Sequence, residues 1–102
     1  MSTLHTVNKS PFSTGSLQSC LNHVKDGDTI LMFEDGVYGA AQGTMIADAV
    51  SAKSGSVALY VLQGDAKARG IETTRLIEGV SSVDYAGFVE LAASHDRTNN
   101  WL

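Results

Sequence analysis

Short apolar runs alternate along the chain with segments whose apolar residues recur at helical spacing. The clearest run covers residues 30–33, which are apolar in succession and are followed directly by Glu34 and Asp35. An apolar run without alternation is typical of a strand buried on both faces, as in a parallel sheet. A second strand of this kind is predicted at residues 57–62, and shorter strands are predicted at residues 4–7 and 80–83.

Helical periodicity fills the segments between these runs. The first helix is predicted from an apolar stripe at i, i+3, i+4 and i+7, formed by Leu17, Cys20, Leu21 and Val24. A second is predicted from Thr44 to about Ser54, with Met45, Ile46, Ala49 and Val50 inward. The last begins at Asp84 as N-cap and has Tyr85, Phe88, Val89 and Ala92 on one face. Asn99 and Asn100 are predicted to form a turn into an apolar terminus.

This alternation of strand and helix predicts the fold class. Parallel strands joined by right-handed helical crossovers give an α/β fold with helices on both faces of the sheet. A chain of 102 residues is long enough for one domain and too short for two. We therefore expect a single three-layer domain spanning residues 1–102, with a doubly wound strand order.

Composition and charge exclude several classes of protein. The chain is 43% hydrophobic and 18% charged, an ordinary globular composition. Seven Lys and Arg are scattered among eleven Asp and Glu, so no basic stripe predicts direct nucleic-acid binding. No apolar stretch approaches the ~20 residues of a membrane span, and residues 1–5 lack the features of a secretory signal. We expect a cytoplasmic protein without a membrane partner.

Cys20 is the strongest nucleophile that the sequence offers. A cysteine reacts as its thiolate, so its chemistry depends on exposure and on nearby charge. Its place in an apolar helical stripe favours a small buried hydrophobe instead. His23, three residues further on, lies close enough on a helix to assist proton transfer. Both interpretations of Cys20 stay open at this point.

Other polar residues give weaker signals. Glu34 and Asp35 are neighbours after a strand, and an Asp-Gly turn is the simplest explanation for them. The three histidines lack metal-ligand spacing, and the glycines match neither a dinucleotide fingerprint nor a P-loop, so we expect neither a metal nor a cofactor. The apolar end Trp101-Leu102 either folds back onto the domain or packs on a partner.

Several stretches, in this order, resemble the DsrH/TusB family of small sulfur-relay subunits, closer to its DsrH branch because of Cys20. The matching stretches are residues 4–11, 34–38, 66–70 and 83–89 and the closing Trp101-Leu102. The resemblance implies a DsrE/DsrF-like domain with a four- to five-stranded, mainly parallel sheet. It also implies a cytoplasmic heterohexamer with DsrE/TusD-like and DsrF/TusC-like subunits.

In that family sulfur moves as a protein persulfide to a small carrier of the DsrC/TusE type. The resemblance makes Cys20 a candidate persulfide thiol, although the better-established sulfur-carrying cysteine belongs to a sister subunit. It also makes interface candidates of six residues: Glu34, Asp35, Asp84, Tyr85, Trp101 and Leu102. Whether such a subunit is catalytic or accessory is left open by the sequence.

Two classes of function therefore remain. The first is a sulfurtransferase-complex subunit, placed in dissimilatory sulfur oxidation because Cys20 is present, with a TusB-like role in 2-thiolation of the tRNA wobble uridine as the alternative. The second is a free-standing, flavodoxin-like binding module with a structural cysteine. An independent hydrolase using Glu34 and Asp35 has little support, because no partner base or oxyanion donor can be named.

Overall fold

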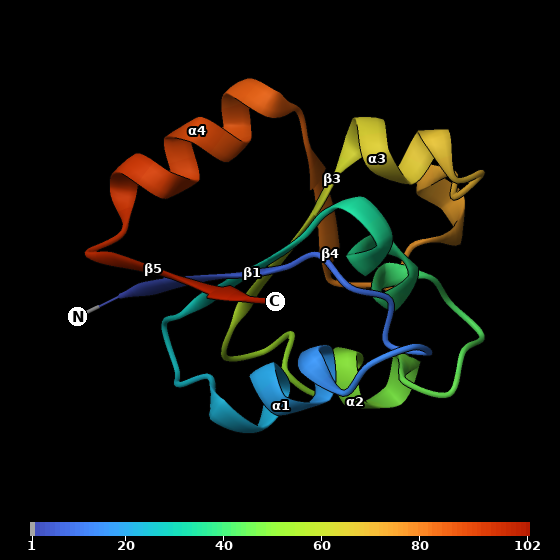
Figure 1. Ribbon diagram of the computed structural model, residues 1–102, viewed down its shortest axis with the longest axis horizontal. Coiled ribbons are helices and arrows are strands. Elements are labelled where there is room, and N and C mark those ends of the chain that lie inside the picture. The colour runs from blue at the N-terminus through green and yellow to red at the C-terminus, as the bar shows by residue number, and fades with distance from the viewer. Residues whose placement is uncertain (1) are drawn as a thin grey trace.

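The computed structural model describes residues 2–102, which form a five-stranded, all-parallel sheet in the order β4-β3-β2-β1-β5 (Figure 1). The strands are β1 (Thr3–Val7), β2 (Thr29–Met32), β3 (Ala58–Leu62), β4 (Val80–Val83) and β5 (Arg97–Trp101). The α-helices are α1 (Ser16–His23), α2 (Ala47–Ser51), α3 (Gln63–Ala68) and α4 (Tyr85–Ser94), with 3₁₀ helices η1 (Glu34–Ala40) and η2 (Thr73–Arg75). The predicted α/β class is confirmed.

The strand order shows how the chain is wound. The chain adds β2, β3 and β4 in succession on one side of β1. It then crosses back over the sheet and places β5 on the other side of β1. Because the crossovers are right-handed, this reversal places the last helix on the opposite face from the first ones. Figure 1 shows α1 and α2 below the sheet and α4 above it. Helices on both faces were predicted, but α4 belongs to a crossover that runs back across the sheet.

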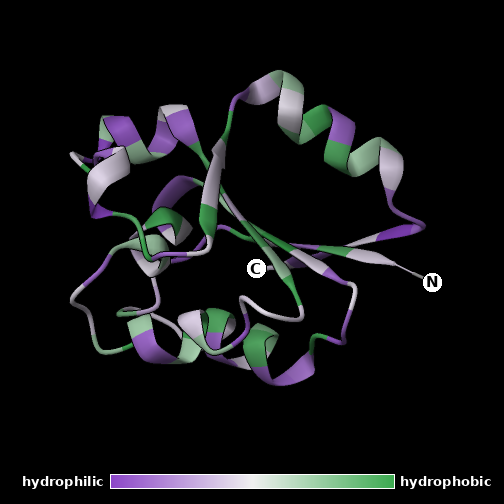
Figure 2. Cartoon of the chain, turned by 180° about the vertical axis from the view of Figure 1, so that it is seen from behind, coloured by the Kyte–Doolittle hydropathy of each residue, from purple (hydrophilic) through white to green (hydrophobic). Residues whose placement is uncertain are grey.

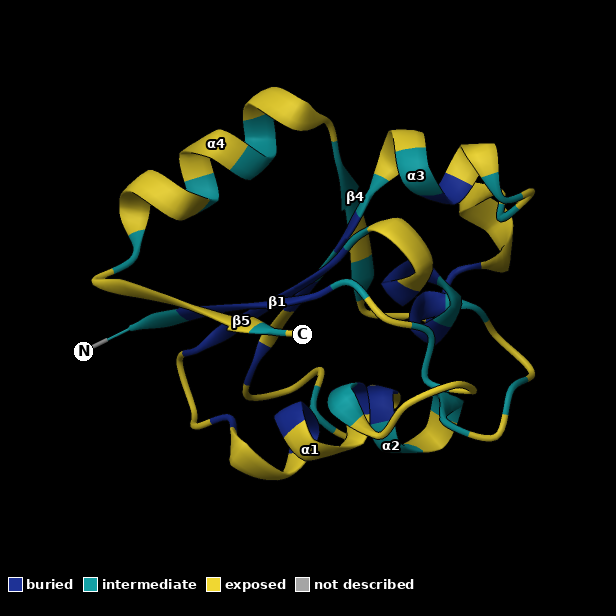
Figure 3. Cartoon of the chain, in the orientation of Figure 1, coloured by how far each residue is buried: buried dark blue, intermediate teal, exposed yellow. Residues whose placement is uncertain are grey.

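The main core lies between the sheet and α1 and α2. Side chains from alternate positions of β1, β2 and β3 meet the apolar stripe of α1, and this set is fully or almost fully buried (Figure 3). It includes Val7, Ile30, Met32, Leu59, Val61, Leu17, Cys20, Leu21 and Val50. The stripe predicted for the first helix is therefore confirmed.

The opposite face is covered more lightly. Leu4 and Leu31 are fully buried there, and α4 is tied to β2 by contacts at both ends of the strand. The ring centroids of Phe33 and Phe88 are 5.9 Å apart, and His95 Nε2 lies 2.8 Å from the Thr29 hydroxyl. These two contacts position α4 across the segment that contains Leu31.

Two local predictions were wrong. Helix α2 covers only Ala47–Ser51, and Met45 is 96% exposed, because residues 43–46 form a turn in which Gly43 has φ +79°. Asn99 and Asn100 lie within β5 and do not form a turn, since β5 pairs in parallel with β1. The Thr6 hydroxyl also donates to Asn100 Oδ1 at 2.6 Å.

Candidate protein-binding surface

Four of the six predicted interface residues lie at the carboxyl edge of the sheet. Glu34 and Asp35 begin η1 directly after β2, whereas Asp84 and Tyr85 begin α4 directly after β4. Because β2, β3 and β4 are parallel neighbours, their carboxyl ends meet at one edge. Ligands of open α/β sheets bind at this edge. The sequence did not indicate that these two pairs lie at the same edge.

Hydrogen bonds to α3 fix the first acidic pair. The Glu34 backbone N–H donates to Asp65 Oδ2 at 2.7 Å, and Arg69 Nε donates to Asp35 Oδ1 at 2.9 Å. Arg69 also reaches the Asp65 carbonyl, 3.2 Å from its Nη1. The hydrogen bond with Asp35 raises the pKa of the Arg69 guanidinium above its ordinary value. Asp35 therefore supports the loop, while the exposed Glu34 side chain faces solvent.

The backbone conformation of this turn explains its sequence. Glu34 has φ +48°, in the left-handed region that non-glycine residues rarely adopt. At Gly36 an added Cβ would lie 2.1 Å from the Val7 carbonyl oxygen, so the chain passes directly against the end of β1. At the predicted Asp-Gly turn, the backbone of Gly36 lies so close to the backbone of Val7 that no side chain fits at position 36. Strain of this kind is concentrated at functional sites.

An aromatic cluster adjoins the acidic residues. Tyr85 and Phe88 meet edge to face at a centroid distance of 6.0 Å, and Phe88 continues to Phe33 beneath. Beside Tyr85 lies a groove of about 410 Å³, lined by Leu62, Gln63, Gly64, Lys67, Asp84 and Tyr85. We call Glu34, Asp35, Lys67, Asp84 and Tyr85 the carboxyl-edge surface. A partly exposed aromatic residue among fixed charges is typical of a protein-binding surface.

Helix α4 extends this surface with apolar residues. Glu90 is the one charged residue in its sequence YAGFVELAAS, yet none of its ten residues is fully buried. Tyr85 is 71% exposed and Val89 54%. Figure 2 shows hydrophobic residues along α4, and Figure 3 colours most of the helix as exposed. An apolar helix left open to water is typical of an interface with another protein.

Cys20 lies far from this edge, in the core between α1 and the sheet. It has no exposed surface. Burial, and next the negative charge of Asp28, raises the pKa of the Cys20 thiol to about 12. Thiolate chemistry needs the opposite conditions, which are exposure and nearby positive charge. This environment favours the buried alternative that the sequence left open.

The remaining two predicted residues separate at the end of the chain. Trp101 folds back and packs against the core, where its indole N–H donates to His5 Nδ1 at 3.0 Å. Leu102 is 83% exposed. His5 in turn bonds Asp28, a pair that sequence reasoning missed. The available signal was a histidine at an inward position of β1, opposite the start of β2 in a parallel register.

Within residues 2–102 there is no group of three or more His, Cys, Asp or Glu side chains that could hold a metal ion. No helix in the same part of the chain is long and apolar enough to cross a membrane.

Fold and surface together define a small α/β domain with an exposed, partly apolar carboxyl edge as its candidate binding surface. Solved structures with the same fold include two described in turn. The first is the ychN protein from E. coli, which has a TM-score of 0.82, is 18% identical, and matches over 98% of this chain and 99% of that one. The second is the protein MTH1491 of unknown function from Methanobacterium thermoautotrophicum, with a TM-score of 0.75, 14% identity and 97% coverage of both chains.

Sequence comparison narrows the class to a family. The family model described as DsrH-like protein matches residues 9–98. Protein TusB from Pectobacterium parmentieri is 36% identical over 98 residues, which are 96% of this chain and 99% of the relative. Protein TusB from Escherichia coli O81 (strain ED1a) is 33% identical with the same coverage. The chain belongs to the DsrH/TusB family of sulfur-relay subunits.

Proposed function

We propose that this chain is an accessory subunit of a cytoplasmic sulfur-relay complex, in which α4 binds sister subunits and the carboxyl-edge surface contacts the sulfur carrier. The observation that carries the proposal is α4, an apolar helix without a fully buried residue. Stable interfaces cover large apolar surfaces, which a subunit that acts alone does not leave exposed. The sister subunits would be DsrE/TusD-like and DsrF/TusC-like, assembled as a heterohexamer.

The two parts of the surface suit different partners. Obligate interfaces are apolar, as the exposed Val89 of α4 is, whereas transient interfaces carry more charge. Glu34 is exposed and held outward by the bond between its backbone and Asp65. It therefore suits a carrier of the DsrC/TusE type that docks and leaves. Sulfur itself would pass as a persulfide between cysteines of the partners.

The burial of Cys20 bears on the metabolic context. Dissimilatory sulfur oxidation was preferred because a cysteine is present, but this thiol is inside the core with its pKa raised to about 12. The relatives matched at 33–36% identity carry the name TusB. Both observations support the alternative context, 2-thiolation of the tRNA wobble uridine, with the chemistry performed by a sister subunit.

The test is native mass spectrometry of the chain co-expressed with its sister subunits. We expect a heterohexamer in the wild type and its loss in Val89→Glu, because burying an unpaired charge in an apolar interface costs about 2 kcal/mol or more, about thirtyfold in the dissociation constant. Ser51→Glu adds the same charge at an exposed position of α2 and serves as the matched control. A wild type recovered only as monomer or homodimer would contradict the proposal and favour a free-standing binding module.

The carrier contact is tested separately on the intact assembly. Glu34→Gln removes a charge from an exposed side chain and leaves its backbone bond to Asp65 in place. We expect the hexamer to persist while carrier affinity falls and becomes less dependent on salt. Unchanged carrier affinity would assign Glu34 a purely structural role.

A further inference from the structure

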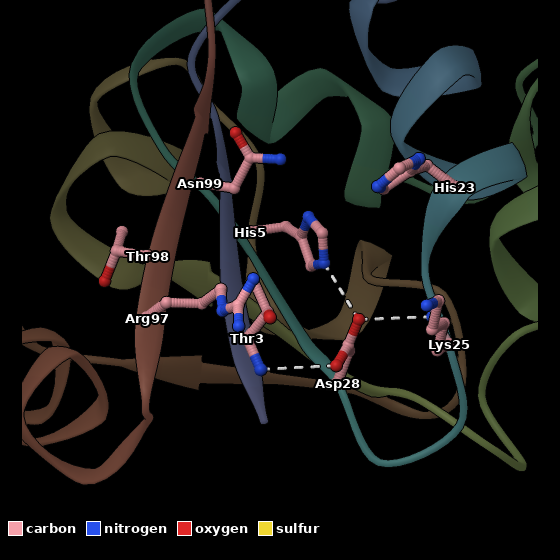
Figure 4. Close-up of a pocket in the computed structure, with 8 residues that line it drawn as sticks. All are labelled: Thr3, His5, His23, Lys25, Asp28, Arg97, Thr98 and Asn99. Carbon is pink, nitrogen blue, oxygen red and sulfur yellow. Dashed lines mark hydrogen bonds and ion pairs between the residues drawn. The ribbon is translucent and has the colours of Figure 1, made fainter. Parts of the chain in front are cut away.

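A buried hydrogen-bonded chain connects the end of β5 to the start of β2, away from the carboxyl-edge surface. Trp101 Nε1 lies 3.0 Å from His5 Nδ1, and His5 Nε2 lies 2.9 Å from Asp28 Oδ2. His5 is 2% exposed and Asp28 7%. Figure 4 shows the bond from His5 to Asp28 within a cavity of about 570 Å³ between β1, β5 and the end of α1.

The chemistry of these groups fixes the protonation state of His5. An indole nitrogen only donates, so Nδ1 of His5 must be the unprotonated acceptor. The proton of the neutral ring is then on Nε2, which donates to the Asp28 carboxylate. A second proton can enter His5 only at Nδ1, where it would face the indole N–H. Docked Trp101 and protonated His5 are therefore mutually exclusive.

An ionised carboxylate stays beside His5 whether or not Trp101 is docked. Burial alone would raise the pKa of the Asp28 carboxyl, but the bond from His5 and the backbone N–H groups of Lys25 and Thr3 hold it below its ordinary value. Asp28 thus stays ionised while imidazoles gain protons. The other titratable or charged side chains lining the cavity are His23, Lys25 and Arg97.

Strand β5 is suited to a local release. It is an edge strand, paired only with β1, and four of its five residues are exposed. Trp101 is the residue of β5 that packs against the core. Its other ties include the backbone pairing with β1, the bond between Thr6 and Asn100, and the bond from Ser16 Oγ to the Leu102 carbonyl at 3.3 Å. Undocking the indole therefore exposes one large apolar side chain, because the other four residues of β5 are polar.

We propose that His5 and Trp101 form a proton-operated latch, in which neutral His5 holds the C-terminal end of β5 and protonated His5 releases it. Release moves the indole from the core to solvent beside the already exposed Leu102 and leaves Nδ1 of His5 open to water. Water then solvates Nδ1–H, and Nε2–H keeps its bond to Asp28, so the charged ring is not left unsatisfied. The device is independent of the proposed partners.

The sequence contains one tryptophan, so Trp101 reports on the latch directly. In proton–nitrogen NMR spectra of the full chain, we expect the indole N–H resonance to move to the position of a solvated indole as the pH falls between about 8 and 5. The fluorescence emission should shift to the red over the same range. Resonances of β2 and β3 should stay dispersed, because the rest of the fold remains intact.

Three histidine variants decide the assignment. His5→Gln keeps one acceptor and one donor but cannot gain a proton, so its indole resonance should be independent of pH. His23→Gln removes a ring 5.6 Å from Trp101 that can alter its fluorescence, and His95→Gln is the matched control near Thr29. The transition should persist in both.

Three results would overturn the latch. They are an indole resonance that stays constant until the whole fold unfolds, a transition that survives in His5→Gln, or one that disappears in His23→Gln. If His5→Gln does not fold, the indole resonance of the wild type still decides the first of these results. Acrylamide quenching, which measures the accessibility of Trp101, distinguishes release from a change in emission alone.

Discussion

At the scale of single residues, Cys20 shows how strongly position controls chemistry. It occupies one turn of α1 between Leu17 and Leu21, all facing the sheet. The helix places His23 nearby, but the charge that acts on the thiol is that of Asp28, which opposes ionisation. A sulfur-carrying role for Cys20 would require the helix to move away from the sheet before reaction.

Thiol labelling tests this environment. With a pKa of about 12, Cys20 should react on the order of a thousandfold more slowly than an exposed thiol at pH 8, until urea unfolds the chain. The matched control is Ser19→Cys in a Cys20→Ala background, which places a thiol on the exposed side of the same helix. Equal labelling rates for the two folded proteins would show that α1 opens readily.

At the scale of elements, α4 depends on Asp84, the residue that caps its N-terminus. Asp84 Oδ1 accepts from the Gly87 N–H at 2.8 Å, which satisfies one of the backbone donors that the first turn leaves free. We expect Asp84→Ala to lower the free energy of unfolding by about 1 kcal/mol, and Asp84→Asn, which keeps an acceptor, to lower it much less. Urea denaturation followed by circular dichroism measures both, and equal losses would rule out the cap.

The strands also show which elements can be predicted from the sequence and which cannot. Strands β2 and β3 were predictable because a buried parallel strand is an apolar run in the sequence, of which residues 30–33 are the clearest. The shorter strands β1 and β4 gave weaker signals and were also predicted. Strand β5 was missed because Arg97 to Asn100 are polar, and this edge strand is defined by its pairing with β1. Neither propensity nor periodicity reports a partner so far away along the chain.

The candidate site could be predicted only in part, because local sequence signals do not report the strand order. Glu34 and Asp84 were indicated by the family resemblance, whose matching stretches 34–38 and 83–89 are local in the sequence. That they share one edge depends on β2 and β4 both flanking β3, which is a property of the strand order. His5 and Asp28 are likewise joined only by the parallel register of β1 and β2.

At the scale of the whole molecule, Asp28 connects segments that come together only in the folded state. Its carboxylate accepts from the Thr3 N–H at 3.2 Å, the Lys25 N–H at 3.1 Å and His5 Nε2 at 2.9 Å. These donors belong to β1 and to the loop after α1. Removing the charge should therefore loosen the sheet and its main helical layer together.

This arrangement predicts how stability depends on pH. The pKa of Asp28 is lowered in the folded state, so the unfolded chain binds the proton more readily. Its contribution to stability is fully present above the ordinary carboxyl pKa of about 3.9 and is lost as the pH falls below that value. We expect Asp28→Asn to be less stable than the wild type by about 2–4 kcal/mol at pH 7, with a difference that shrinks below about pH 4.

Urea titrations between pH 2 and pH 7 test this expectation. Between pH 2 and pH 5 the comparison lies below the range in which imidazoles titrate. The stability difference in this range therefore reports on the carboxylate and not on a histidine. Asp26→Asn removes the same charge from an exposed neighbour and should leave the curve almost unchanged. A difference between Asp28→Asn and wild type that stays constant down to pH 2 would show that the carboxylate acts through its shape alone. A shrinking difference identifies its charge as the group that joins β1, β2 and α1.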